Sequence, residues 1–285
     1  MFERLGNSFS LARSSWQVLW TDKKLVIFPV LSVIGCAFVF LGFATPFIAK
    51  PHLLDFLNNN GNGVHPPPWV YVVAFVYYFC SYFVVIFFNA ALISCALIRF
   101  NGGTPTVGDG IQAAASRLPQ ILAWALVSAT VGVLLKMIEN AHERAGAFIS
   151  AILGTAWTIM TFFVVPVLVV ERVGPIDAIK RSIQILKRNW GEALIGNWGI
   201  GLFVFLLALP GIVVGVFGFF ALQTAVPLGV AVLVLAGLYL LVIGAAVGPA
   251  LHGIYLAALY QYAANGEIPS GFDGGELKQA FQRKK

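Results

Sequence analysis

Six long apolar runs alternate with short polar segments along the chain. Each run holds about 20 residues or more, which is the length an α-helix needs to cross the hydrocarbon core of a bilayer. The pattern predicts six spans, at about residues 25–49, 69–98, 118–137, 145–170, 193–221 and 226–252. In the last run Gly244 and Gly248 precede Pro249, which predicts a kink or a helix contact. We expect one membrane domain over residues 1–264, followed by a polar, basic tail at 265–285.

A basic amphipathic helix is predicted between the fourth and fifth runs, at about residues 175–190. Its charged residues are too many for a span, so it should lie in the headgroup plane with its apolar face toward the lipid. Similar spacing predicts two weaker interfacial helices, at about residues 2–20 and 106–117. The apolar residues of the basic helix step by three and four positions, and they are Ile176, Ile179, Ile183, Leu186 and Trp190. The basic face opposite them consists of Lys180, Arg181, Lys187 and Arg188.

The composition agrees with a polytopic membrane protein. Hydrophobic residues make up 59% of the 285 residues and charged residues only 11%, too few to form a soluble surface. The mean hydropathy is +0.86, and the predicted fold class is an all-α membrane bundle. A net charge of +6 would suggest nucleic acid in a soluble protein, but here the basic residues lie beside apolar spans. Membrane lipids, anionic ones included, are therefore the predicted partners, and nucleic acid is not.

The distribution of basic residues predicts the orientation of the chain. With six spans, fifteen of the 18 Lys and Arg residues lie in the segments on the same side as the termini. The other side holds only Lys50, Lys136 and Arg144. Because basic loops stay in the cytoplasm, both termini should be cytoplasmic.

A repeat accompanies this topology. The second span is followed by Asn101-Gly102-Gly103-Thr104-Pro105 and then Asp109-Gly110, and the sixth by Asn265-Gly266-Glu267-Ile268-Pro269 and then Asp273-Gly274. A shortened form, Gly174-Pro175-Ile176-Asp177, follows the fourth span. The repeated unit is an interfacial helix and a two-span hairpin. We expect three hairpins related by an axis along the membrane normal.

Several stretches support a family resemblance, among them FERLGNSFSLARSSWQVL, GGTPTVGDGIQAA and FFVVPVLVVERVGPIDAIKRS. The chain resembles an uncharacterised family of six-span bacterial membrane proteins over nearly its whole length. The resemblance implies a location in the cytoplasmic (inner) membrane. More distantly, the hairpin and basic-helix pattern is similar to the membrane domain of some glycerophosphodiester phosphodiesterases, but no soluble phosphodiesterase domain accompanies it here.

Motifs for catalysis, metal or cofactor binding are not found in the sequence. There is no P-loop, dinucleotide glycine fingerprint, nucleophile elbow or HExxH motif, so we expect no enzyme, no cofactor and no catalytic residues. The three cysteines, Cys36, Cys80 and Cys95, lie in apolar runs without metal-ligand spacing, which predicts neither a disulfide nor a metal site. They should act as small packing residues.

Three polar residues within the spans, Asn89, Asn197 and His252, fall toward the cytoplasmic leaflet. They are candidates for a polar recess, although hydrogen bonds between helices explain them equally well. The predicted function is that of a non-enzymatic membrane protein that binds lipid or organises the bilayer, with Lys180, Arg181, Lys187 and Arg188 at the headgroups. The alternative functions are a secondary transporter or channel for a small solute, and a scaffold for cytoplasmic proteins. The sequence leaves open whether the protein forms a homo-oligomer.

Overall fold

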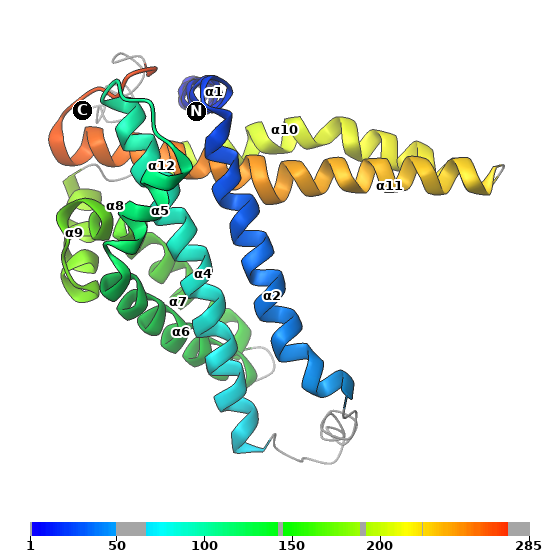
Figure 1. Cartoon of the computed structure of the whole chain (residues 1–285), viewed down its shortest axis with the longest axis horizontal. Helices are drawn as coiled ribbons and strands as arrows, with labels where there is room; N and C mark the ends of the chain where they lie inside the picture. The colour runs from blue at the N-terminus through cyan, green and yellow to red at the C-terminus, as the bar shows by residue number, and fades with distance from the viewer. Residues whose placement is uncertain (1, 50–66, 142–144, 189–191, 224, 273–285) are drawn as a thin grey trace. The chain divides into compact units, whose positions relative to one another are not determined.

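A computed structural model describes residues 2–49, 67–141, 145–188, 192–223 and 225–272. Helices form nearly all of this part of the chain, and no strand occurs within it (Figure 1). Six of the helical segments are long and apolar enough to cross a membrane, which confirms the predicted fold class. The elements in chain order are α1 (Phe2–Thr21), a 3-10 turn (Lys23–Val26), α2 (Ile27–Ala49), α4 (Pro68–Phe100), α5 (Val107–Ala115), α6 (Leu118–Ala141), α7 (Ala145–Met160), α8 (Val164–Glu171), α9 (Pro175–Arg188), α10 (Glu192–Ala221), α11 (Val226–Val242), the π-helical turn η4 (Ile243–Val247) and α12 (Gly248–Asn265).

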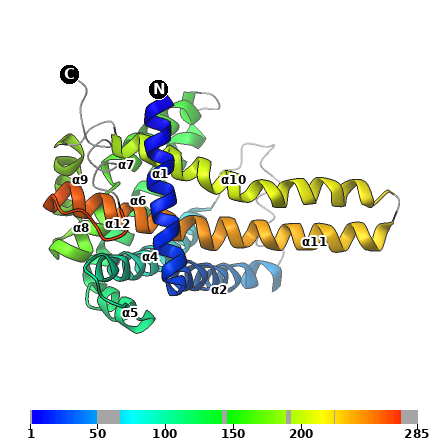
Figure 2. The same cartoon turned by 90° about the horizontal axis from the view of Figure 1, so that it is seen from above.

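The chain divides into two compact units, and each is described by itself. The first comprises the described parts of Met1–Val30, Ala91–Ala113 and Gln184–Lys285, and the second those of Leu31–Ala90 and Ala114–Ile183. In the first unit α10 and α11 form an antiparallel pair that runs side by side in Figures 1 and 2. α1 packs against α10 and α12 (Figure 2). The core of this unit includes nearly all of α12, whose residues from Gly253 to Gln261 are buried.

The α10–α11 pair is held by a close approach of small and aromatic residues. A Cβ added to Gly211 would lie 2.5 Å from the ring of Tyr239, so the ring packs directly on the glycine backbone. The Tyr239 hydroxyl donates a hydrogen bond to the carbonyl of Leu207 at 2.6 Å. Pro210 lies inside α10 and disturbs the backbone hydrogen bonds of the preceding turn. The tyrosine therefore joins α11 to the α10 backbone one residue beyond Leu206, whose carbonyl is the one that lacks the Pro210 donor.

The transition from α11 to α12 is irregular at the place where the sequence predicted a kink or contact. Over Ile243–Val247 the helix takes the wider π form, and the Gly248 N–H donates to the Ile243 carbonyl five residues earlier. Pro249, which follows, has no N–H to donate. The candidate span Val226–Asn265 is 40 residues long, longer than one crossing requires.

The predicted repeat has a local counterpart at the ends of three helices. Gly102 after α4 has a φ of 82°, Arg172 after α8 has 58°, and Gly266 after α12 has 74°. This left-handed conformation is the usual way to end a helix, and glycine adopts it without the steric cost that a side chain brings. Superposition of the three hairpins stays a prediction, as does the division of the chain into one membrane domain and a tail.

A capping box begins α5. The Thr106 hydroxyl accepts a hydrogen bond from the Asp109 N–H at 3.2 Å, and the Asp109 carboxylate accepts one from the Thr106 N–H at 2.8 Å. The Thr106 N–H and the Thr106 hydroxyl both donate to the Asp109 carboxylate at 2.8 Å, and these two bonds hold the pKa of Asp109 below its usual value near 3.8. Buried Cys95 lies beneath this helix, 2.7 Å from the position of a Cβ added to Gly110.

Candidate functional site

The basic helix of the sequence analysis is α9, and its sides differ from the predicted two faces. Its protein-facing side is made of small residues, because Ala178 and Ser182 are completely buried and Ile185 nearly so. The predicted apolar face lies beside it: Leu186 is buried, Ile179 and Ile183 are half-buried, and Ile176 is 68% exposed. Trp190 lies outside the described residues. The helix thus packs on the protein along one side and leaves isoleucines on an adjacent side.

Two of the four residues in the basic face form ion pairs. The Lys180 ammonium lies 3.2 Å from the Asp177 carboxylate, and both side chains are about two-thirds exposed. The Arg181 guanidinium donates to the Glu171 carboxylate at 2.8 Å, in a half-buried position at the end of α8. Lys187 is exposed. An exposed ion pair contributes about 0–1 kcal/mol, so Lys180 can leave Asp177 for another anion at little cost in free energy.

The side chain of Arg188 lies outside the described part of the structure, although its backbone ends α9. Of the predicted basic face, Lys180 and Lys187 are therefore the residues that the structure places at the surface. Arg181 also has a structural contact, since it joins α9 to the end of α8.

The fourth span is interrupted where α9 meets it, which the sequence analysis did not predict. α7 ends at Met160 and α8 begins at Val164, although the apolar run continues without a break. Pro166 lies in the first turn of α8, where it cannot donate to the carbonyl four residues earlier and its ring crowds that carbonyl. The N–H of Phe163 donates instead to the Ser182 hydroxyl oxygen of α9 at 3.0 Å. A serine of the basic helix thus satisfies a backbone group that the broken helix leaves unpaired.

The far end of α8 is held by an arginine that the sequence analysis assigned no role. Arg117, just before α6, donates from Nε to the Val169 carbonyl at 3.2 Å and from Nη1 to the Ser116 carbonyl at 3.3 Å. Such a contact caps carbonyls at a helix C-terminus, where positive charge is favourable. Burial lowers the pKa of the Arg117 guanidinium below its ordinary value, and the nearby charge of Arg172 lowers it further.

The described candidates for a polar recess belong to different units. Asn89 is half-buried in α4 and belongs to the second unit, whereas His252 is half-buried in α12 of the first. The side chain of Asn197 lies outside the described residues. The recess therefore stays a prediction.

A different polar cluster occurs in the first unit, between two loops that the repeat relates. The Gln261 amide nitrogen donates to Asn101 Oδ1 at 3.3 Å and to Glu267 Oε2 at 3.2 Å. The Ser270 hydroxyl donates to the Phe100 carbonyl at 2.6 Å. These contacts fasten the end of α4 to the loop after α12. The matching Asn-Gly sequences predicted similar loops but gave no indication that they meet.

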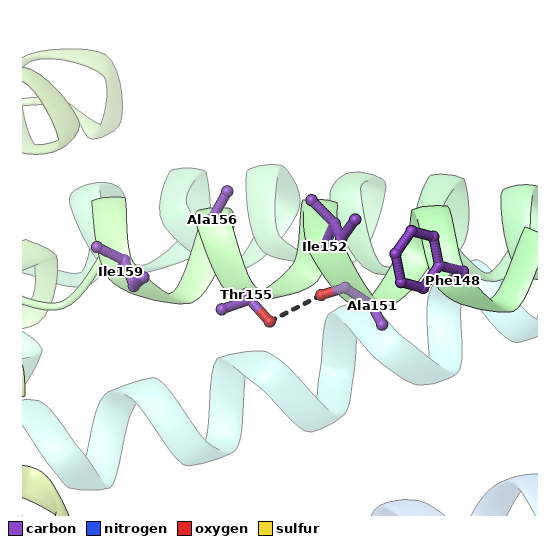
Figure 3. Close-up of a pocket in the computed structure, with 6 residues that line it drawn as sticks. All are labelled: Phe148, Ala151, Ile152, Thr155, Ala156 and Ile159. Atoms are coloured by element: carbon purple, nitrogen blue, oxygen red, sulfur yellow. Dashed lines mark hydrogen bonds between the residues drawn. The ribbon is translucent and has the colours of Figure 1, made fainter.

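An apolar groove of about 390 Å³ lies along α7 (Figure 3). Figure 3 shows that its lining side chains come from successive turns of this one helix, and the single hydrogen bond drawn there joins Thr155 to the Ala151 carbonyl. The lining contains no ionisable group, so we assign the groove no chemistry. Its residues are Phe148, Ala151, Ile152, Thr155, Ala156 and Ile159.

Candidate metal ligands do not gather in the described part of the chain, where no group of three His, Cys, Asp or Glu side chains could hold an ion. The three cysteines are free thiols, and Cys95 is buried as a packing residue. The expectations of no metal, no cofactor and no catalysis stay predictions.

The structure gives the class of protein, and the family comparison gives the family. Six apolar helices of spanning length define a multi-pass helical membrane protein. The chain belongs to a family of unknown function, DUF6159, whose model matches residues 69–272. This agrees with the resemblance to an uncharacterised family. No curated protein and no solved structure matches the chain.

Proposed function

We propose that this protein is a non-enzymatic protein of the bacterial cytoplasmic membrane that binds anionic lipid through the basic face of α9. Both termini are cytoplasmic in this proposal, as the excess of basic residues on their side supports. The distant resemblance to the membrane domain of some glycerophosphodiester phosphodiesterases belongs to the same proposal, without the phosphodiesterase activity.

The observation that carries the proposal is the division of α9 into three sides. Ala178 and Ser182 are buried against protein, and Ile179 is half-buried on the neighbouring side. Lys180 and Lys187 extend from the next side and are exposed. A helix that is packed on protein, apolar beside that contact and basic beyond it suits the boundary between acyl chains and headgroups. Each lysine near an anionic surface contributes about 1 kcal/mol.

The test is lipid retention by the purified protein. The wild type and a Lys180→Gln/Lys187→Gln variant are placed in nanodiscs of phosphatidylcholine with about 20% phosphatidylglycerol, released gently, and analysed by native mass spectrometry. This nanodisc composition approximates a moderately anionic leaflet. We expect the variant to retain less phosphatidylglycerol. The variant leaves Arg181 in place because its loss would also break the ion pair with Glu171.

Lys136→Gln serves as the matched control. Lys136 is also an exposed lysine paired with a carboxylate, Glu139 at 3.1 Å, but it lies on the predicted outer side. Equal losses from Lys136→Gln and from the double variant would mean that only net charge matters. Unchanged retention in the double variant would exclude the basic face of α9 as a lipid site.

A secondary transporter is the second candidate, and the interrupted helices favour it. The break between α7 and α8 and the π turn η4 are irregularities within candidate spans. Discontinuous helices of this kind form the substrate and ion sites of many transporters. Uptake of labelled small solutes into proteoliposomes tests this function, and no uptake above that of protein-free vesicles for any solute class would count against it.

A further inference from the structure

Two arginines come together at the C-terminal end of α8. Arg117 reaches this turn from the start of α6, as its hydrogen bond to the Val169 carbonyl at 3.2 Å shows. Arg172 follows α8 directly, three residues after Val169, and is exposed. Three residues correspond to about one helical turn, roughly 5 Å, so both side chains start from the same end of the helix. Both residues belong to the second unit.

The positive charge at this end of α8 is not paired with any carboxylate of the described residues. The adjacent acid, Glu171, forms its ion pair with Arg181 of α9 at 2.8 Å. Across the part of the chain that the structure describes, neither Arg117 nor Arg172 forms an ion pair. Two guanidinium groups near each other without a counter-charge repel, and an anion between them would remove the repulsion.

The backbone conformation of Arg172 is a second observation in favour of a functional site here. Its φ of 58° makes it the one non-glycine residue in the described chain with a left-handed conformation. At the corresponding places in the repeat, after α4 and α12, Gly102 and Gly266 fill this conformation. Glycine would be the unstrained choice here as well, and an arginine held in a strained conformation is a reason to look for a function.

Both arginines flank candidate spans. Arg117 precedes the candidate span Leu118–Glu139, and Arg172 follows the candidate span Gly146–Glu171. One span begins and the other ends at these arginines, so both lie on the same side of a bilayer. The phosphates of phospholipids lie at this depth, just outside the hydrocarbon core.

We propose that Arg117 and Arg172 together bind the phosphate of an anionic phospholipid headgroup. Arg117 uses Nε and one Nη1 hydrogen for backbone carbonyls and keeps its other N–H groups for the phosphate oxygens. Arg172 supplies the second guanidinium. The site rests on the proposed function in that it names a lipid ligand, but it uses different residues from the basic face of α9.

The test combines two readouts on the full-length protein, one in nanodiscs and one in detergent. The first is the number and affinity of bound phosphatidylglycerol molecules, measured by native mass spectrometry. The second is the thermal midpoint in lipid-free detergent. For Arg172→Gly we expect the loss of one tightly bound phosphatidylglycerol, with at least about tenfold weaker binding, because charge-assisted hydrogen bonds are lost. The same variant should have a raised thermal midpoint, because glycine relieves the left-handed backbone.

Two more variants separate a lipid site at the arginines from a purely structural role. Arg117→Gln should lose the same lipid, whereas Arg99→Gln, a control arginine in the last turn of α4, should keep it. Unchanged phosphatidylglycerol binding in both Arg172→Gly and Arg117→Gln would overturn the site. A fall in thermal midpoint of Arg172→Gly with lipid binding retained would also overturn it, because Arg172 would then be structural.

The source of the phosphate is decided in the same experiment. Inorganic phosphate and glycerol 3-phosphate, added at millimolar concentration, should not displace the bound lipid. If either displaces it fully, the site takes a soluble phosphate and the lipid assignment is wrong. Loss of lipid in Lys180→Gln/Lys187→Gln alone would support the basic face and overturn the arginine site. Loss of lipid in the arginine variants alone would support the arginine site and overturn the basic face.

Discussion

The hydrogen bond between Phe163 and Ser182 gives the sharpest test of the interrupted fourth span. Both residues are completely buried, and the donor is a backbone N–H. Ser182→Ala removes the acceptor and leaves this N–H without a partner. A buried donor in that state costs about 1–3 kcal/mol. We therefore expect Ser182→Ala to lower the free energy of unfolding by that amount, which reduces the ratio of folded to unfolded protein roughly 5-fold or more.

Local rearrangement should not recover this cost, because Pro166 prevents a continuous helix. Without the proline, the Phe163 N–H would be free to donate to Ile159, four residues earlier, as in a regular α-helix. The double variant Pro166→Ala/Ser182→Ala should therefore lose less than the sum of the two single changes. Additive losses would show that the proline does not enforce the break.

Unfolding is followed by tryptophan fluorescence during titration of detergent-solubilised protein with SDS. Trp157, three residues before the end of α7, stacks on Trp124 of α6 with ring centroids 5.6 Å apart and reports on this region. Thr155→Ala is the matched control, because its hydroxyl donates to a helix carbonyl at an exposed position. That change should stay within about 0.5 kcal/mol. Equal effects of Ser182→Ala and Thr155→Ala would refute the reasoning.

Three further predictions concern the first unit. Gly211→Ala should lower the free energy of unfolding in SDS by about 1–3 kcal/mol, because the new methyl would meet the Tyr239 ring, whereas Gly237→Ala, with nothing within 4 Å, should change it by less than about 0.5 kcal/mol. Tyr239→Phe should cost about 0.5–1.5 kcal/mol in the same titration, because it removes the hydrogen bond to the α10 backbone, and no loss would argue against that bond. The lowered pKa of Asp109 contributes stability that is present above its ordinary pKa near 3.8 and is lost as the pH falls through the lower folded value. The thermal midpoint of Asp109→Asn should accordingly lie below that of the wild type at neutral pH and converge on it in acid, and a constant difference would exclude the carboxylate's bonds to Thr106 as the cause.

Sequence reasoning succeeded where the signal was local. The second span was expected at about residues 69–98, and α4 runs over Pro68–Phe100. The basic helix was expected at about 175–190, and α9 covers Pro175–Arg188. Apolar length and helical spacing are properties of neighbouring residues, so they are readable without the fold.

Sequence reasoning failed where a helix is interrupted inside an apolar run. Residues 145–170 look like one continuous span because every hydropathy window there is high, and α7 nevertheless ends at Met160. Pro166 was the available signal, since a proline within a helix needs the helix to start shortly before it or to bend. A single proline does not say which of these occurs. The buried Ser182 that stabilises the break stands 19 residues further on.

The candidate sites also combine features that the local sequence predicts with contacts that it does not predict. The sequence by itself determined that the chain has six apolar helices of spanning length and a basic amphipathic helix between the fourth and fifth, because the bilayer requires a fixed length of apolar helix and both features can be read from local composition. Only the tertiary structure decided that Arg117 contacts Val169, 52 residues away, and thereby lies near Arg172. Such pairings depend on how helices distant in the sequence pack together, and hydrophobic periodicity carries no information about the partner that each helix meets.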